Sequence, residues 1–474
     1  MSASHVSTLV AALLLAGCAS LQAPAVDASA GVTAPAQWNS APVATAGAQP
    51  GAAVPADSLA DWWQRFGDAD LSRLVGDALA ANTDVASARA ALRQARALRD
   101  VDQAQAGPRL DASGSAQRSR SNGASASNSF RAGFDASWEP DVFGGNRAGI
   151  AASEADLQAS SASLGDVQVS VAAEVALAYL ELRGSETRLA IARDNLASQQ
   201  DTAQITQWRV QAGLATSLES EQARASVEQT RAQIPSLQKA IAQSRHQLAL
   251  LTGRTVGALQ LAESTTLPQP ATDLALAFPA DTLRQRADVR AAEARVRAAA
   301  QRVVQADAAR YPSFSLSGSL GLQALTLSGL SGGGAVASAL LASVSLPLFD
   351  GGAAKAQTAA QQAAYDQARE SHRSAVLVAL KDVEDALVAL QRDRERLATL
   401  QQAAEAAGNA ALLARQRYAS GLIDFQTVLE TQRSLLSAQD NVAASRIDVA
   451  TDHVRLYKAL GGGWTPTPDN SKTS

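Results

Sequence analysis

Ser137-Trp-Glu-Pro-Asp-Val-Phe-Gly-Gly145 opens a stretch of the chain that continues to Gly213 without another proline. Proline and the paired glycines do not propagate a helix, so a helix is expected to begin just after them. The residues that follow are mainly Ala, Gln, Glu, Arg, Leu and Val, which are good or tolerable helix formers. At about 1.5 Å per residue, a helix from Asn146 to Gln211 would be roughly 100 Å long, too long for an ordinary globular domain. The stretch therefore predicts a stave of a coiled coil or helical barrel.

The same pattern occurs a second time in the chain. Ser345-Leu-Pro-Leu-Phe-Asp-Gly-Gly352 is followed by helix-forming sequence from Ala353 to Arg417 and then by Gly421. Short matches relate the two copies at a constant offset of 208 residues (421 − 213 and 461 − 253). They are Arg188-Leu-Ala190 with Arg396-Leu-Ala398, Ala212-Gly-Leu214 with Ser420-Gly-Leu422, and Leu248 to Gly253 with Leu456 to Gly461. The chain is therefore expected to be a tandem structural repeat.

Each copy also contains a pair of short alternating segments, in which apolar residues lie on one face and polar residues on the other. The predicted strands are 109–118, 130–138, 313–322 and 336–349, with a polar loop at 119–129 and a Gly/Ser loop at 328–334. Segments of about ten residues with this alternation are typical of outer-membrane barrel strands. The alternative is two soluble hairpins packed on a core, but no nearby helix offers enough apolar surface to cover them.

Four strands cannot close a transmembrane barrel, because the smallest such barrels have eight. Open strand edges are not tolerated in lipid, so other copies of the chain would have to complete the sheet. A dimer would give eight strands with a lumen filled by side chains, and a trimer would give twelve with space for a pore. The serine-rich polar face suits a wet lumen, which favours the trimer.

The first residues indicate export and lipid attachment. Val6 to Ala16 is an apolar segment too short to span a bilayer as a mature helix, and we interpret it as the core of a signal peptide. Leu15-Ala-Gly-Cys18 resembles a bacterial lipobox, which implies cleavage before Cys18 and lipidation of that residue. Ala19 resembles the pattern of lipoproteins sent to the outer membrane. The alternative is an ordinary buried thiol; a single cysteine excludes an internal disulfide.

Further helices are expected before each hairpin and after each long helix. They are 69–106 and 282–310 leading into the hairpins, and 217–251 and 425–460 returning from the turns at Gly213 and Gly421. Pro235 lies inside the first returning helix and predicts a kink or break there. The aromatic cluster Trp62, Trp63 and Phe66 is expected to dock the start of the folded chain onto the body.

Composition argues against an enzyme. The net charge is −4, which gives no nucleic-acid footprint. The four histidines are scattered without metal-ligand spacing, and no phosphate-binding loop or nucleophile elbow is present. We therefore expect no catalytic residues, no metal and no cofactor, apart from a lipid on Cys18.

Several co-ordered motifs make a family resemblance specific. They are Trp62-Trp-x-x-Phe-Gly-Asp68, Ser137 to Gly145, Tyr311-Pro-Ser-Phe-Ser-Leu-Ser-Gly-Ser319, Leu346-Pro-Leu-Phe-Asp-Gly-Gly352, and Arg417 to Gln432. The chain from Leu59 to Trp464 resembles the outer membrane factor family, the trimeric channel-tunnels of bacterial multidrug efflux and type I secretion. One departure is Ala287, where relatives usually have proline; only a local effect is expected.

The resemblance implies an α+β membrane protein. It is expected to be a homotrimer with a 12-stranded outer-membrane β-barrel, four strands per chain, continuous with a long periplasmic α-helical barrel and an equatorial domain. The lipobox indicates the lipoprotein branch that serves efflux pumps. The implied partners are outer-membrane lipid, a periplasmic adaptor and an inner-membrane pump of a Gram-negative bacterium, and no nucleic acid.

The expected domain boundaries follow from these elements. They are signal peptide 1–17, lipidated Cys18 and tether 18–58, first-repeat helix 59–107, first hairpin 108–143, long helix, tip and returning helix 144–253, inter-repeat linker 254–280, second-repeat helix 281–311, second hairpin 312–349, second long helix, tip and returning helix 350–461, and tail 462–474.

Two candidate sites lie near the turns between the long and returning helices. The expected adaptor-docking tips are Gly213, Leu214, Gly421, Leu422 and Asp424. A helix turn there exposes backbone and small side chains to another helical hairpin. The alternative is that the two glycines serve only the turn.

The second candidate site is a gate just above the tips. Glu219, Tyr418, Glu430 and Arg446 resemble the family's constriction, where acidic rings and Tyr/Arg links hold the tunnel closed. Relatives often have arginine two residues after the second tip glycine, where this chain has Ile423. Three stacked carboxylates around a narrow axis would attract cations and repel one another. The alternative is that both glutamates are solvated helix charges.

The sequence thus predicts a passive exit duct of a tripartite efflux system, with energy for transport supplied by a partner. The alternatives are a type I secretion component and a periplasmic coiled-coil scaffold lipoprotein without a pore. Selectivity is assigned to the inner-membrane pump, because tunnel walls in the family are polar and permissive.

Overall fold

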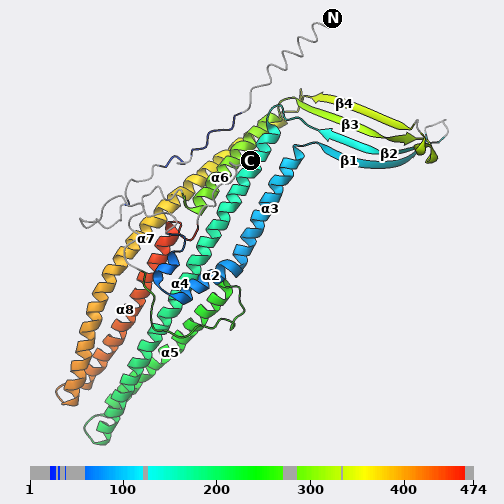
Figure 1. Ribbon diagram of the computed structural model, residues 1–474. Helices are drawn as coiled ribbons and strands as arrows, with labels where there is room; N and C mark the ends of the chain where they lie inside the picture. Colours follow the sequence, from blue (N-terminus) through cyan, green and yellow to red (C-terminus); the bar gives the residue numbers. More distant parts are fainter. Residues whose placement is uncertain are drawn as a thin grey trace. The chain divides into compact units, whose positions relative to one another are not determined.

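The computed structural model describes residues 22–27, 30–32, 38, 59–120, 126–270, 285–332 and 335–464 (Figure 1). The predicted signal peptide, Cys18, most of the tether, the second half of the linker and the tail after residue 464 lie outside these residues. The chain forms two compact units. The strand unit comprises Met1–Val32, Ala90–Ser161 and Arg290–Ala375, and the tip unit comprises Thr33–Arg89, Ala162–Val289 and Val376–Ser474.

The strand unit contains one antiparallel sheet of four strands in the order β1-β2-β3-β4. The strands are β1 (Arg109–Ser119), β2 (Ser127–Trp138), β3 (Ser313–Ala324) and β4 (Val336–Ser345). Cross-strand partners share a face, so the register places Phe134 beside Ala112 and Leu320. That face carries even-numbered, mainly apolar residues, and the other carries polar ones, where Ser113 donates to Asp135 at 2.7 Å and Arg131 donates to Gln323 at 3.1 Å. The predicted alternation of the strands is confirmed.

Two details of the sheet differ from expectation. β4 ends at Ser345 instead of Phe349, and Pro347 explains this because it cannot donate to the ladder. The segment 328–334 is not only a loop, since Ser328–Ser331 forms the 3-10 helix η5.

The helices repeat with the offset found in the sequence. α4 (Gly145–Gln211) and α7 (Ala353–Ala419) have 67 residues each, and α5 (Ser217–Leu251) and α8 (Phe425–Ala459) have 35 each. All four boundaries of the first pair recur 208 residues later. α5 is continuous through Pro235, so the chain does not break there, and the expected kink stays a prediction.

Each of these helices ends in the same motif. Gly213 and Gly421 adopt φ of 71° and 72°, and the amide of the following leucine donates back five residues, Leu214 to Arg209 at 2.7 Å and Leu422 to Arg417 at 2.9 Å. Gly253 and Gly461 close α5 and α8 in the same way. This is the Schellman motif, in which glycine supplies the left-handed residue.

The helix expected over 69–106 is two helices, α2 (Ala69–Ala81) and α3 (Thr83–Gln105). Asn82 separates them, because its backbone is extended and its side-chain oxygen accepts from the amides of Asp84 (2.8 Å) and Val85 (3.3 Å). Its amide group also donates to the Leu251 carbonyl at 3.0 Å, which ties the junction to the end of α5. Asparagine is a preferred N-cap, so the break has a local cause.

α6 (Ala287–Ala308) begins five residues later than the expected 282. Ala287 is therefore its first residue, the helix position that tolerates proline best. Alanine is a good helix former, so Ala287 also suits this position.

The core of the tip unit gathers around the middle of α4. Trp62 of η3 (Trp62–Phe66) is fully buried and stacks on Tyr457 at 5.4 Å between ring centroids, as the aromatic cluster predicted. By length and composition α4 is the one described helix that could cross a membrane. Half of the residues in its most apolar 18-residue stretch are buried inside the protein. Because Val175, Tyr179 and Leu182 of α4 are fully buried in this core, we assign it as a core helix.

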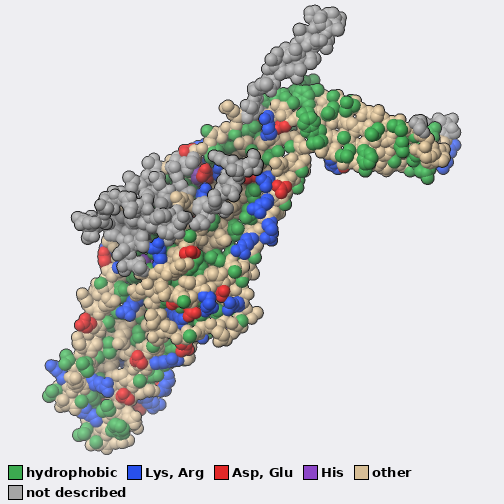
Figure 2. Space-filling model, viewed as in Figure 1, with side chains coloured by type: hydrophobic (Ala, Val, Ile, Leu, Met, Phe, Trp, Pro, Cys, Tyr) green, Lys and Arg blue, Asp and Glu red, His purple; other side chains and the backbone are tan. Residues whose placement is uncertain are grey.

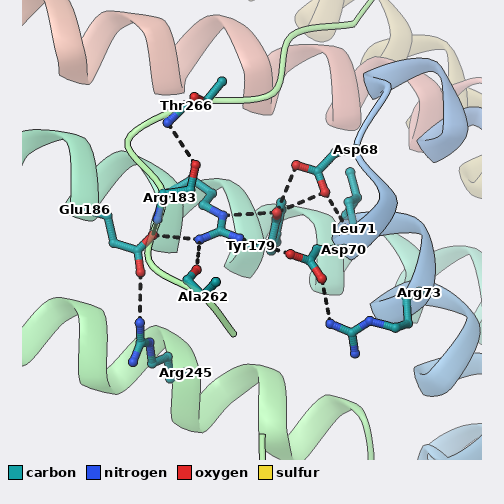
Figure 3. Close-up of polar contacts among 11 residues, drawn as sticks. Asp68, Asp70, Leu71, Arg73, Tyr179, Arg183, Glu186, Arg245, Ala262 and Thr266 are labelled. Carbon is teal, nitrogen blue, oxygen red and sulfur yellow. Dashed lines mark hydrogen bonds and ion pairs between the residues drawn. The ribbon is translucent and has the colours of Figure 1, made fainter. Parts of the chain in front are cut away.

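A buried polar cluster fixes the described part of the inter-repeat linker, residues 254–270, to α4 (Figure 3). Arg183 donates to Glu186 (2.8 Å), to the Ala262 carbonyl (2.7 Å) and to the Tyr179 hydroxyl (3.0 Å). Glu186 also accepts from Arg245 at 3.0 Å, and Tyr179 donates to Asp68. Burial raises the pKa of Tyr179, so this hydroxyl stays protonated and can donate.

The end of α5 gives a direct test of this packing. Gly253 and Gly213 have nearly the same φ, but a Cβ on Gly253 would lie 2.5 Å from the Ala81 carbonyl oxygen, whereas one on Gly213 would meet nothing within 4 Å. Gly213→Ala should cost only the left-handed conformation, about 1 kcal/mol. Gly253→Ala should cost about 2–4 kcal/mol, because a backbone atom must also move. Thermal unfolding followed by circular dichroism would show this ranking; equal losses would contradict the close approach of α2 and α5.

Candidate functional site at the helix tips

The two turns between long and returning helices lie at one end of the tip unit (Figure 1). Each returning helix is preceded by an N-cap residue, and the two N-caps occupy the same repeat position. Thr216 caps α5 in a capping box, accepting from the Glu219 amide while Glu219 accepts from the Thr216 amide at 2.7 Å. Asp424 caps α8 and accepts from the Thr427 amide at 2.9 Å. Both tips are therefore rigid turns with their backbone ends satisfied.

Asp424 is held in its charged form. The hydroxyl and then the amide of Thr427 donate to its carboxylate, and these bonds lower its pKa below the usual value. At neutral pH this exposed cap presents a fixed negative charge beside Leu422.

The apolar side chains of the tips face outward. Leu214 is 71% exposed and Leu422 is 74% exposed, although both are large hydrophobic residues. Leu218 and Trp208 are also exposed on the first tip, and Figure 2 shows hydrophobic side chains gathered at this end. Exposed apolar groups clustered on one end are typical of a protein interaction surface.

The inner side of the tips forms a small core of its own. Tyr418 is buried and packs against Phe425 at 5.4 Å between ring centroids. Ala223 of α5 and Val428 and Leu429 of α8 complete the contact. The cluster joins the first hairpin to the second.

Arg209 of the first hairpin contacts Tyr418 of this cluster, and we refer to this Arg209–Tyr418 contact as the lock. Its guanidinium carbon lies 4.4 Å above the Tyr418 ring centroid, and its Nη1 donates to the Tyr418 carbonyl at 3.1 Å. The Tyr418 hydroxyl is buried and has no hydrogen-bond partner among the described residues. The arginine therefore holds the ring and the last turn of α7 at once.

Two buried side-chain hydrogen bonds connect α4 to the returning helices farther from the tips. Gln432 of α8 donates to Thr202 of α4 at 2.9 Å, and Thr230 of α5 donates to Gln199 of α4 at 2.8 Å. These side chains are buried, so their hydrogen bonds fix the lateral register of α4 against both returning helices.

Within one protomer the four expected gate residues lie apart from one another. Tyr418 lies in the tip core, Glu219 in the capping box, and Glu430 on an exposed face where it accepts from Gln426 at 3.0 Å. Arg446 lies 21 residues beyond the first residue of α8, about 32 Å along its axis. Within one protomer it is therefore too far along the helix to pair with Tyr418.

Sequence reasoning missed Arg209, although a signal was present. Arg209 and Arg417 occupy the same repeat position, four residues before the tip glycine. The second copy has a tyrosine, Tyr418, at the position where the first copy has Val210. Arg209 of the first copy can therefore stack on a tyrosine of the second, whereas Arg417 has no tyrosine at the equivalent position of the first. A position-by-position comparison of the two copies would have identified Arg209 and Tyr418 as a candidate pair.

No metal centre is formed in the described part of the chain, where no three His, Cys, Asp or Glu residues are grouped to hold an ion. The tips offer apolar surface, capped turns and an arginine lock between helices.

Comparison with known proteins agrees with this geometry. The profile described as "Outer membrane efflux protein" matches residues 74–254 and 278–462, which is more than half of the chain. The chain is 34% identical to pyoverdine export outer membrane protein OpmQ of Pseudomonas aeruginosa, with 98% of both chains covered. It is 32% identical to outer membrane protein OprJ of the same organism, covering 97% of this chain and 96% of that one.

Solved structures show the same fold. The outer-membrane channel OprN superposes with a TM-score of 0.87 at 33% identity, covering 94% of this chain and all of that one. Outer membrane protein VceC from Vibrio cholerae gives a TM-score of 0.80 at 27% identity, covering 85% of this chain and 99% of that one. The chain belongs to the outer membrane efflux protein family and has the α+β channel-tunnel fold of its outer-membrane members.

Proposed function

We propose that the protein is the exit duct of a tripartite efflux system and conducts small molecules passively out of the cell. One observation carries the proposal: a four-stranded sheet with one apolar and one polar face continues into helices of 67 residues. The sheet can cross the outer membrane, and the helices are long enough to form a periplasmic tunnel, about 100 Å each. A partner pump would supply the energy.

The sheet itself supports a homotrimer. β1 and β4 each pair on one side only, so each leaves a free edge. Lipid does not satisfy free backbone groups, so neighbouring copies would pair β4 of one with β1 of the next. Three copies give twelve strands, and the serine-rich polar face would line a wet lumen.

Aromatic residues support the placement of the membrane. Phe143 stacks on Tyr311 at 5.1 Å and on Phe314 at 6.4 Å, next to the ends of β2 and β3 that join the helices. Trp138 ends β2 and donates its indole N–H to the Ala106 carbonyl at 3.2 Å. Aromatic belts mark the edge of the hydrocarbon region, so this end would lie at the periplasmic interface.

We further propose that Cys18 carries the lipid anchor, on the basis of the lipobox. The tips, with Gly213, Leu214, Gly421, Leu422 and Asp424, would receive the hairpin of a periplasmic adaptor. Their exposed leucines and the charged cap of α8 support this role. Relatives named for pyoverdine export and toluene efflux support small molecules as cargo.

The gate would form where three tips meet around the axis. We assign the closing lock to Arg209 and Tyr418, and the charged ring to Glu430, whose side chain is exposed on α8. Glu219 would add a second ring only if its capping bond to Thr216 broke. Arg446 would act at another level, about 32 Å from the start of α8.

Conductance tests the channel and the charged ring together. Purified protein in planar bilayers should give small, cation-selective currents, because carboxylates at a constriction attract cations. Glu430→Gln should lower the cation preference without loss of folding, and Glu405→Gln, an equal loss of charge at an exposed residue of α7, should leave it unchanged. Folded oligomers without any current would favour the scaffold alternative, and unchanged selectivity would remove Glu430 from the gate.

The lock gives a separate prediction. Arg209→Ala removes a stacked cation and a hydrogen bond, together worth about 1.5 kcal/mol, so the open probability should rise about tenfold. Arg417→Ala is the matched control, since it removes the repeat-equivalent arginine, which is exposed and stacks on no tyrosine ring. Single-channel recording measures both. An equal effect of the two substitutions would mean that loss of charge, and not the lock, controls the gate.

A further inference from the structure

A short segment near the N-terminus lies against α6 and α7 within the strand unit. Ala23 and Val26 pack on a cluster formed by Val296, Ala299 and Ala300 of α6 and Tyr365 of α7. Both are half-buried, although the segment 22–27 has no regular secondary structure. The segment is therefore seated on an apolar face, and we refer to residues 22–27 as the strap.

Tyr365 clamps the middle of the strap. Its ring is buried, and its hydroxyl donates to the Ala25 carbonyl at 2.9 Å. The guanidinium carbon of Arg369 lies over the ring, 5.8 Å from its centroid. One side chain thus provides the apolar contact and the backbone hydrogen bond that an extended segment requires.

The strap ends in a turn close to His372. Asp27 accepts from the Ala30 amide through its carbonyl and from the Gly31 amide through its carboxylate, both at 3.1 Å. His372 is only 2% exposed, one turn of α7 below Ala368, which also contacts the cluster. Burial lowers the pKa of His372, and the charges of Glu293 on α6 and Asp27 on the strap act against that shift. His372 is therefore a buried, neutral side chain of α7 that lies one turn from the strap's contact surface and within reach of the Asp27 charge.

We propose that the strap is an intramolecular docking element, held by Tyr365, that limits how far a lipid on Cys18 can lie from the helical body. Tyr365 is 12 residues beyond the first residue of α7, about 18 Å along its axis. Seven residue steps separate Ala25 from Cys18, a reach of at most about 25 Å. A docked strap therefore lets the lipid reach the level where α7 begins with little length to spare. The anchoring part of the inference rests on the proposed lipidation; the docking part does not.

Chemical modification of histidine tests the docking without new reactive groups. Diethylpyrocarbonate modifies neutral imidazoles, and mass spectrometry would compare His372 with the exposed His246 and the buried His453 on the purified oligomer. In the wild-type protein His372 should react at least about tenfold more slowly than His246. Equal rates for His372 and His246 would overturn the docked strap.

Variants then release the strap in two ways. Val26→Asp places a charge in the apolar contact and should bring the rate at His372 close to that at His246. Gln22→Asp adds the same charge at an exposed strap residue and should leave His372 protected. Tyr365→Phe removes only the hydrogen bond and should raise the rate about fivefold. Protection that survives Val26→Asp would show that something other than the strap covers His372 and would overturn the proposal.

A deletion tests the limit on reach. Removing Ser20 and Leu21 leaves five steps, at most about 18 Å, so seating the strap and inserting the lipid would compete. His372 should become reactive in the lipid-bearing deletion variant reconstituted in vesicles, and should stay protected when the same deletion is made with Cys18→Ser behind a non-lipoprotein signal. Protection in both would overturn the limit, whereas the mass of the wild-type N-terminal peptide tests lipidation independently.

Discussion

The backbone of the four-stranded sheet leaves two edges open, and most other features of the molecule follow from this constraint. Among the described residues β1 and β4 each lack a partner strand on one side, while the face shared by Phe134 and Leu320 is apolar. In water such a sheet would aggregate, and in lipid its edges would be unsatisfied. Only pairing between copies resolves both problems. In the proposed trimer the polar face would turn inward and line the duct.

The tandem repeat gives each copy the same helices, yet the two tips differ in packing. The second hairpin has a buried aromatic pair, Tyr418 and Phe425, and the equivalent positions in the first hairpin are Val210 and Ser217. The first tip instead exposes apolar groups and sends Arg209 onto the second. A threefold assembly would therefore alternate two kinds of hairpin. The Arg209–Tyr418 contact lies inside each protomer, so opening of the proposed gate would require the two hairpins of one chain to separate.

Charged groups are used differently in the middle of the tip unit. Arg183 and Glu186 are both buried and bind the linker through the Ala262 carbonyl and the Ser264 amide. A buried ion pair contributes little net stability over an apolar pair, but removing one member leaves the other unpaired at high cost. The cluster thus specifies where the crossing between the repeats lies. Proposed movement at the tips would leave this part of α4 fixed.

The sequence alone determined the repeat, the ends of the long helices and the alternation of the strands, because glycine turns, proline and side-chain period act locally. It also carried the family resemblance. It did not place the break at Asn82, whose side chain reaches the Leu251 carbonyl 169 residues away. It missed the contact of Arg209 with Tyr418, since only the packing of α4 against α7 and α8 decides which side chains of one protomer meet. Local chemistry sets the elements of this protein, and long-range contacts select the residues that lock them.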